Sequence, residues 1–472
     1  MRRLFPWALA VVLGCAIGIT ASTLAWQERQ RLAAFGPSGP PPREGGRLPW
    51  VGEQPNVVLV IGTSVRRDQV TPYGGHPAAT PFLTELAESG SRFSGAIAAA
   101  PSTRAANTVI ATGQPFRAIG MARSPGTANQ RRLAPEATTI AERFREAGYW
   151  AIGGASDPSL AGVFGFDQGF FRYHDVSDLG RRDPGRVAGS QVVDRLLREI
   201  DRPQRRNAPL FLQIELSDAD PPGSFDEREL AQFADDRSPV RLQKYRVYLN
   251  RFDTALRRLS NGLLIRGFDD SNTIFVVVSD HGAGLAWPPD PGADRSSLLT
   301  PPVVEMVWMA RGRGVRAGGV VPGLASQVDV LPTLAGLAGV QGYAGPGRDW
   351  SLPLRDGGTT DRDLVFVDSD SARSDQAAAF GEQVACEWSR RTETPIVRCF
   401  DRRADPYHRT ALAVPDPVVS AALQRWRAGQ DEASAAWTWT GDATLTPEQR
   451  AWFDSPEPGP ESPDPGEGGA GE

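Results

Sequence analysis

Two short segments of this chain carry residue types that could perform chemistry together. Asp280 and His281 follow the apolar run TIFVVVS at 273–279 and precede Gly282. A carboxylate and an imidazole at the carboxyl end of a strand can both face a bound cation. The alternative interpretation is a plain Asp-x-Gly turn, because motifs this short often match by chance.

The second segment is Ser102-Thr103, within APSTR and followed by AANTVIATG, which ends at Gly113. The small residues predict a helix that begins near Ser102 and places Thr103 at its N-terminus. Free N–H groups and the helix dipole favour an anion there. The Thr103 hydroxyl could attack a sulfate or phosphate ester if a metal or a base lowered its pKa. The alternative is that Ser102 or Thr103 only caps the helix.

The surrounding pattern alternates strands and helices, as expected for a mostly parallel sheet covered on both faces. Ligands of such sheets gather at the carboxyl ends of the strands. The expected strands are 56–61, 149–152, 210–216, 273–279 and 303–309. The expected helices are 80–90, with Thr80 as the N-cap, and 141–147, 240–264 and 328–338.

Four fragments, in this order, resemble the sulfatase/alkaline-phosphatase superfamily. They are PNVVLVIGTSVRRDQVTPYGG continued by TPFLTELAESGSRFSGAIAAAPSTRAANTVIATG, then NTIFVVVSDHGAGL, SQVDVLPTLAGLAGV and CFDRRADPYHRTALA. The resemblance covers roughly 55–425 and implies an α/β fold. That fold is an alkaline-phosphatase-like sandwich with a large, mostly parallel sheet, helices on both faces and a smaller C-terminal antiparallel sheet or hairpin subdomain.

The resemblance also implies a site. Family members hold one or two divalent cations between a carboxylate after the first strand, a nucleophile, and an Asp-His or Asp-Asn pair. Counting back ten positions from Gly113 assigns the nucleophile to Thr103, and Asp280 with His281 matches the pair. Because position 103 is neither Cys nor Ser, a formylglycine sulfatase is not expected.

Several charged positions of the family pattern are replaced in this chain. The first-strand carboxylate, eight positions after Pro55, is Thr63, and a neutral hydroxyl is a weak ligand for hard cations. Asn107 stands where the family usually has Arg or His. Asp220 replaces a histidine, and either it or Asp218 is a candidate extra metal ligand.

Two hypotheses follow from this mixture of retained and lost residues. In the first, the chain is a catalytically impaired, pseudoenzyme-like relative that acts by binding an anionic ester or another small molecule, or a protein partner, and needs no metal. In the alternative, it is an active sulfate or phosphate ester hydrolase or phospho-transferase. That enzyme would use Thr103, with Asn107 beside it, and a divalent cation (Ca, Mn, Zn or Mg) on Asp280, His281 and the degenerate ligand Thr63. The loss of several ligands together favours the first hypothesis.

The N-terminus predicts export from the cytoplasm. Residues 7–26 form an uncharged apolar stretch behind Arg2 and Arg3, long enough for a single membrane-spanning helix with its N-terminus inside. A cleaved signal peptide, or a lipoprotein signal acylated at Cys15, would also export the chain. The remaining cysteines, Cys386 and Cys399, flank a turn-like stretch and are expected to form a disulfide in an exported compartment. The net charge of −5 argues against nucleic acid as a partner.

The expected organisation has five parts. An anchor or signal segment (1–26) is followed by a Pro/Gly-rich linker (27–54) and a sulfatase-like catalytic-type domain (55–345). A C-terminal subdomain of the same fold (346–453) and an acidic, Pro/Gly-rich tail that is expected to be disordered (454–472) complete the chain. The bulk of the protein is expected in the periplasm or outside the cell.

Overall fold

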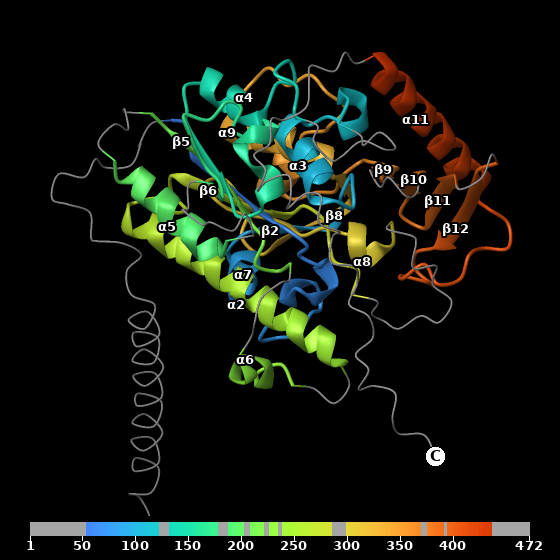
Figure 1. Ribbon diagram of the computed structural model, residues 1–472, viewed down its shortest axis with the longest axis horizontal. Helices are drawn as coiled ribbons and strands as arrows, with labels where there is room; N and C mark the ends of the chain where they lie inside the picture. Colours follow the sequence, from blue (N-terminus) through green and yellow to red (C-terminus); the bar gives the residue numbers. More distant parts are fainter. Residues whose placement is uncertain are drawn as a thin grey trace, which may run out of the picture.

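The computed structural model describes residues 53–121, 132–177, 187–202, 208–220, 226–234, 238–285, 299–369, 375–390 and 394–436. Its main feature is an eight-stranded sheet in the order β4-β3-β5-β1-β6-β7-β2-β8 (Figure 1). The strands are β1 (Asn56–Gly62), β2 (Ser91–Ile97), β3 (Trp150–Ala155), β4 (Arg172–His174), β5 (Leu210–Leu216), β6 (Thr273–Ser279), β7 (Trp308–Gly312) and β8 (Gly319–Ser326). Only the pairings made by β7, with β6 and β2, are antiparallel.

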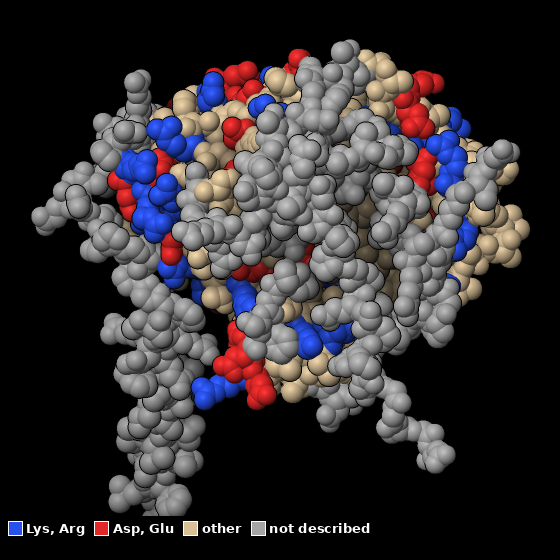
Figure 2. Space-filling model, viewed as in Figure 1, with Lys and Arg blue, Asp and Glu red and all other residues tan. Residues whose placement is uncertain are grey.

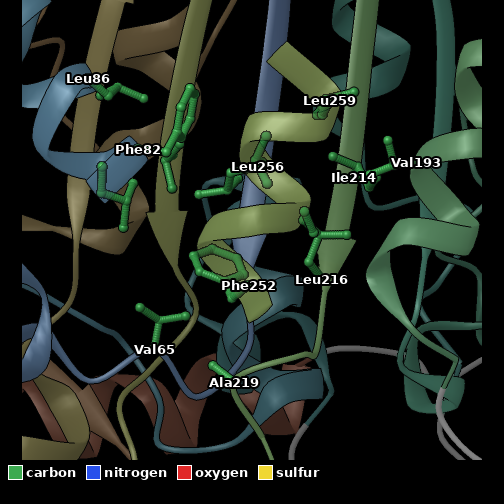
Figure 3. Packing of buried hydrophobic residues seen from close by; sticks show 14 of the residues in the cluster. Val65, Phe82, Leu86, Val193, Ile214, Leu216, Ala219, Phe252, Leu256 and Leu259 are labelled. Atoms are coloured by element: carbon green, nitrogen blue, oxygen red, sulfur yellow. The ribbon is translucent and has the colours of Figure 1, made fainter. Parts of the chain in front are cut away.

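Helices cover both faces of this sheet. Alternate residues of β1 explain why, since Val58 and Val60 join one buried cluster and Val57, Leu59 and Ile61 join another. The first cluster lies under α2 (Pro81–Ser89), α5 (Gly189–Ile200) and α7 (Val240–Ile265). The second lies under α3 (Thr103–Thr112), α4 (Ile140–Glu146), α9 (Val330–Ala338) and α10 (Ser351–Asp356). Figure 3 shows Val193 of α5 and Leu259 of α7 beside Ile214 of β5, and Phe82 and Leu86 of α2 further along the same cluster.

A separate four-stranded antiparallel sheet follows the main one, in the order β12-β11-β10-β9. Its strands are β9 (Val365–Asp368), β10 (Asp375–Phe380), β11 (Val384–Arg390) and β12 (Ile396–Asp401), and α11 (Pro417–Ala436) follows them in the chain. Cys386 and Cys399 are directly paired across β11 and β12 and form the expected disulfide. Buried Leu423 of α11 packs in the same cluster as this disulfide, so the helix and the crosslink stabilise one small core.

The predicted fold class is confirmed, with one local correction. The segment 303–309 is not one strand, because Pro301 and Pro302 begin a short helix, α8 (Pro301–Val304), and the strand β7 starts only at Trp308. Thr80 is the N-cap position of α2 but makes no capping bond. Its hydroxyl accepts a hydrogen bond from Thr71 N–H. The first N–H groups of the helix, those of Phe82 and Leu83, donate instead to the carboxylate of Asp253 in α7.

The predictions for 1–26, for nearly all of the 27–54 linker and for the 454–472 tail lie outside the described residues. Among the residues that the structure describes, no helix is both long and apolar enough to cross a bilayer.

Candidate functional site

Thr103 and His281 meet at the carboxyl edge of the main sheet. Thr103 is the first residue of α3, and His281 lies two residues after β6 ends. The Thr103 Oγ1 and His281 Nε2 atoms are 3.3 Å apart. The N-cap residue, Ser102, makes no side-chain capping bond, so the capping interpretation of this hydroxyl pair has no support from the helix geometry.

Hydrogen bonds fix the orientation of His281 and Asp280. The Nδ1 atom of His281 lies 2.7 Å from the Gly282 carbonyl oxygen, an acceptor, so this nitrogen carries a hydrogen. Nε2 faces both Thr103 and Asp280 Oδ2, the latter at 3.6 Å. Gly282 itself is held close to α8, where a side chain would collide with the Pro302 carbonyl. The loop after β6 is therefore built to hold this imidazole in one place.

The Asp280 carboxylate is fully buried and already has protein donors. Its Oδ1 accepts hydrogen bonds from the backbone N–H of Ser64, at 3.0 Å, and of His281, at 2.6 Å. Burial raises the pKa of Asp280, while the charge of His281 and these two N–H donors act to lower it. Gln327 donates to the Asp280 carbonyl at 2.7 Å and so fixes the backbone here as well.

Asn107 lies one turn into α3, on the side that faces Asp280. Its Nδ2 donates to the Thr103 carbonyl at 2.8 Å and lies 3.5 Å from Asp280 Oδ2. An amide at this position gives Asp280 a neutral neighbour where the family pattern has a charged side chain. The structure thus brings Thr103, Asn107, Asp280 and His281 into one cluster, and their catalytic roles stay predictions.

Thr63 lies at the end of β1 and is turned toward a carboxyl group that the sequence analysis did not single out. Its hydroxyl donates to Glu215 Oε1 at 2.6 Å. Glu215 belongs to β5, which pairs with β1, and its Oε2 accepts from the N–H groups of Ser156 and Asp157, both at 2.9 Å. The signal in the sequence was an acidic residue inside the apolar run LFLQIEL.

The surroundings of Glu215 favour its protonated form. Burial is the main cause that raises its pKa, to about 8, and the charges of Asp157 and Asp280 add to the shift. The bonds donated by Thr63 and by Asp157 N–H act in the other direction. At neutral pH the protonated form therefore predominates, and a neutral hydroxyl and a neutral carboxyl group lie side by side beneath Asp280.

Ser64, the residue after Thr63, has a left-handed backbone with φ 59°. This conformation is uncommon for residues other than Gly, Asn and Asp. It directs the Ser64 N–H to Asp280, while the Ser64 carbonyl accepts a hydrogen bond from the buried Tyr245 hydroxyl at 2.8 Å. The chain after β1 is thus held in a strained shape by the bonds that satisfy Asp280.

The side-chain oxygen and nitrogen atoms at this edge are not arranged to coordinate a divalent cation. Hard cations require several charged oxygens, but Thr63 is committed to Glu215, one Asp280 oxygen is committed to two N–H groups, and Nε2 of His281 contacts Thr103. Within the described ranges, no group of three or more His, Cys, Asp or Glu residues is arranged to hold a metal.

The two candidate extra ligands, Asp218 and Asp220, follow the end of β5. Asp218 accepts a hydrogen bond from Gly189 N–H, at 3.0 Å to Oδ1, where α5 begins, and burial raises its pKa. Asp220 follows in a turn in which its N–H donates to the Ser217 carbonyl. Their role as extra ligands stays a prediction.

The parallel sheet with a separate antiparallel sheet, and a site where strands end beside a helix start, define an alkaline-phosphatase-like protein. Residues 55–340 match the family model described as Sulfatase. The chain belongs to the sulfatase family.

The individual proteins that resemble this chain match it over a short segment or at low sequence identity. An arylsulfatase from Klebsiella aerogenes is 32% identical over 112 residues, which is 22% of this chain and 24% of the relative, so the match spans about a quarter of that protein. Among solved structures, Ps i-CgsB in complex with k-i-k-neocarrahexaose superposes with a TM-score of 0.66 at 16% identity, covering 82% of this chain and 95% of that one. A protein of the alkaline phosphatase superfamily from Vibrio parahaemolyticus gives 0.60 at 18% identity, with 87% and 91% covered. These structural similarities support the fold.

Proposed function

We propose that this protein is a membrane-anchored, extracytoplasmic sulfatase-family member that binds a ligand in its cleft and does not catalyse metal-dependent ester hydrolysis. The observation that carries the proposal is the hydrogen bond from Thr63 to Glu215. Thr63 stands at the position of the family's first-strand carboxylate, where a bound cation needs negative charge. In this chain that position instead forms a neutral pair with Glu215.

The retained part of the site supports binding. Thr103 begins a helix of ten residues whose free N–H groups and dipole favour an acceptor-rich ligand. The Thr103 hydroxyl and the His281 ring can each donate or accept a hydrogen bond. We therefore propose a small molecule, with an anionic ester as the first candidate, as the occupant of this cleft, and a protein partner as a further candidate.

The test is to measure metal content and turnover together on the purified full-length chain. We expect no stoichiometric Ca, Mn, Zn or Mg by elemental analysis after dialysis. We also expect no hydrolysis of aryl sulfate, phosphate monoester or phosphodiester substrates when these metals are added. Stoichiometric metal that resists chelators would contradict the proposal, because it would show that the site has the ligands that we count as lost.

The second candidate, an ester hydrolase or phospho-transferase that uses Thr103, is favoured by one observation, the 3.3 Å contact between its hydroxyl and His281. It predicts turnover that Thr103→Ala abolishes. Thr112→Ala is the matched control, since it removes the same hydroxyl from the far end of the same helix, where it bonds the Thr108 carbonyl and the Gln114 N–H. Turnover that survives Thr112→Ala and disappears with Thr103→Ala would establish this candidate.

A further inference from the structure

The two loops that form the candidate site leave strands that are not neighbours. Thr103 follows β2 and His281 follows β6, and β7 lies between these two strands in the sheet. No ladder joins β2 directly to β6, so contacts outside the sheet must help to set the distance between the Thr103 hydroxyl and the His281 ring.

One buried side chain, that of Gln327, is bonded to both loops. Its Nε2 donates to the Asp280 carbonyl at 2.7 Å, and its Oε1 accepts from Ala99 N–H at 3.1 Å. Asp280 is the residue before His281, and Ala99 lies four residues before Thr103. The two ends of one amide thus join the loop that carries the imidazole to the loop that carries the hydroxyl.

The turn that carries Gln327 has a fixed position of its own. Gln327 begins η6 (Gln327–Asp329), a 3-10 turn between β8 and α9. Asp329 is fully buried and accepts hydrogen bonds from the N–H groups of Ser326 and Arg348, both at 2.8 Å, and from the Trp350 ring at 2.9 Å. The Gln327 side chain therefore extends from a firmly held backbone into the space between the two loops.

Backbone bonds from the segment before β7 support the same loops. The Val304 carbonyl accepts from Ala98 N–H at 2.7 Å, and the Val303 carbonyl accepts from Gly282 N–H at 2.6 Å. These bonds persist when a side chain is replaced. Gln327 differs from them because a single side chain spans both loops, so its contribution can be removed without changing Thr103 or His281.

The spacing of the two loops matters for a ligand because the contact between them is long. Thr103 Oγ1 and His281 Nε2 are 3.3 Å apart, and a hydrogen bond is lost beyond about 3.5 Å. The surface offers little compensation for misplaced donors. Figure 2 shows Lys and Arg intermixed with Asp and Glu on the described part of this face, and the net charge is −5. An anion is then held by well-placed hydrogen bonds rather than by a field of one sign.

We propose that Gln327 is the positioning residue of the cleft, and that it sets the contact between Thr103 and His281 by holding Ala99 and Asp280 at a fixed separation. This inference rests on the proposed function, in which the Thr103 hydroxyl and the His281 ring contact an anionic ester. Gln327 acts through these two residues and does not itself bind the ligand.

The ligand-independent readout is ¹⁵N magic-angle-spinning NMR of the full-length chain labelled at its four histidines. His281→Gln assigns the His281 signals by their loss. Thr103→Val removes the hydroxyl beside Nε2 and should displace the Nε2 signal. Gln327→Met keeps the length of the side chain, removes both of its bonds, and should displace the same signal in the same direction.

The double variant and a matched control make the test specific. If Gln327 acts by setting the contact with Thr103, adding Gln327→Met to Thr103→Val should displace the signal no further. Gln168→Met makes the same chemical change where the amide donates to the carbonyls of Pro135 and Ala137, at 3.1 and 2.8 Å, and should leave the signal in place. Should Gln327→Met not fold, Gln327→Asn replaces it, because the shorter amide cannot reach both loops at their native spacing.

Three results would overturn the inference: an unmoved His281 signal in Gln327→Met, an equal displacement by Gln168→Met, or a full further displacement in the double variant. Inorganic sulfate, titrated by calorimetry, gives the second readout. We expect Gln327→Met to weaken its binding about tenfold, or about 1.4 kcal/mol, and Gln168→Met to leave it unchanged. If the native chain binds no sulfate, the proposed anion binding is contradicted, while the NMR comparison still decides the role of Gln327.

Discussion

The buried carboxyl group of Glu215 gives the most direct test of how this site is built. The native protein should become less stable as the pH rises from weakly acidic to weakly basic. We expect Glu215→Gln to remove much of this pH-dependent loss. The amide copies the protonated carboxyl group. Its oxygen can accept from the N–H groups of Ser156 and Asp157, while its NH₂ donates to the Thr63 hydroxyl, which then acts as the acceptor.

The sign of the effect follows from the direction of the pKa shift. Burial and the neighbouring charges raise the pKa of Glu215 from 4.5 to about 8 in the folded protein. Between these values the folded protein holds a proton that the unfolded chain has released. The free energy of unfolding therefore falls as pH rises, by at most about 1.4 kcal/mol per pH unit. Over the whole window the ceiling is roughly 5 kcal/mol, and the contribution no longer changes above pH 8.

The measurement is urea denaturation followed by tryptophan fluorescence at a series of pH values from about 5 to 9. The difference in unfolding free energy between Glu215→Gln and the native chain should move in favour of the variant as pH rises, by several kcal/mol. Glu146→Gln makes the same chemical change on the surface of α4, where the side chain is 66% exposed, and should leave the curve parallel to that of the native chain.

An infrared difference spectrum between the native chain and Glu215→Gln gives an independent readout. The native protein at neutral pH should show the carbonyl band of a protonated carboxyl group, and the variant should lack it. Parallel stability curves for the two proteins, together with no protonated-carboxyl band at neutral pH, would refute the reasoning. They would show that the four hydrogen bonds to Glu215 keep it ionised, and the description of a neutral pair beneath Asp280 would be wrong.

Three further predictions concern metal, crosslink and helix cap. Replacing Thr63 and Ser64 together by Asp should destabilise the metal-free protein through repulsion with Asp280 and Glu215. It should also create a rise in melting temperature on adding Ca or Mg that the native chain lacks; equal cation effects on both proteins would contradict this. Replacing Cys386 and Cys399 by Ser should cost about 3 kcal/mol in urea denaturation, from the 13-residue separation that the crosslink closes, and reductant should then have no further effect. Asp253→Ala should lower the free energy of unfolding by about 1–2 kcal/mol, because Phe82 and Leu83 N–H lose their acceptor. Thr80→Val should lower it less, because the Thr80 side chain makes no capping bond to α2. The reverse order would contradict the assignment of Asp253 as the cap.

Much of the fold was predictable because its strongest signals are local. The apolar runs of β1 and β6 can only be buried on both faces, and the structure places both in the middle of the sheet. The meeting of Thr103 with His281 was also predictable, since both follow strands whose carboxyl ends share an edge. The limits of the strand near 303–309 were not, because two prolines change the local geometry at a point where the apolar pattern continues.

The features that escaped prediction are long-range hydrogen bonds. Thr63 and Glu215 are 152 positions apart, and Asp253 is 171 positions from the Phe82 N–H that it accepts. A lone acidic residue in an apolar strand is unfavourable in isolation, and only the parallel register of β1 and β5, which brings Glu215 beside the end of β1, shows what satisfies it. The sequence could show that charge had been lost from position 63, but it could not show which group had become its partner.

The charge that the family pattern has at position 63 and the buried Glu215 belong to one arrangement. A cation at this edge would compensate several buried carboxylates at once, and without it Asp157, Glu215 and Asp280 would repel each other in a buried environment. Two features of the structure reduce this repulsion, since burial and the neighbouring charges raise the pKa of Glu215 and two backbone N–H groups donate to Asp280. A hydroxyl at position 63 suits both states of Glu215, because it can donate to the carboxylate or accept from the acid. On our proposal, the same arrangement stabilises the site without a metal and leaves Thr103 and His281 in place to contact a ligand.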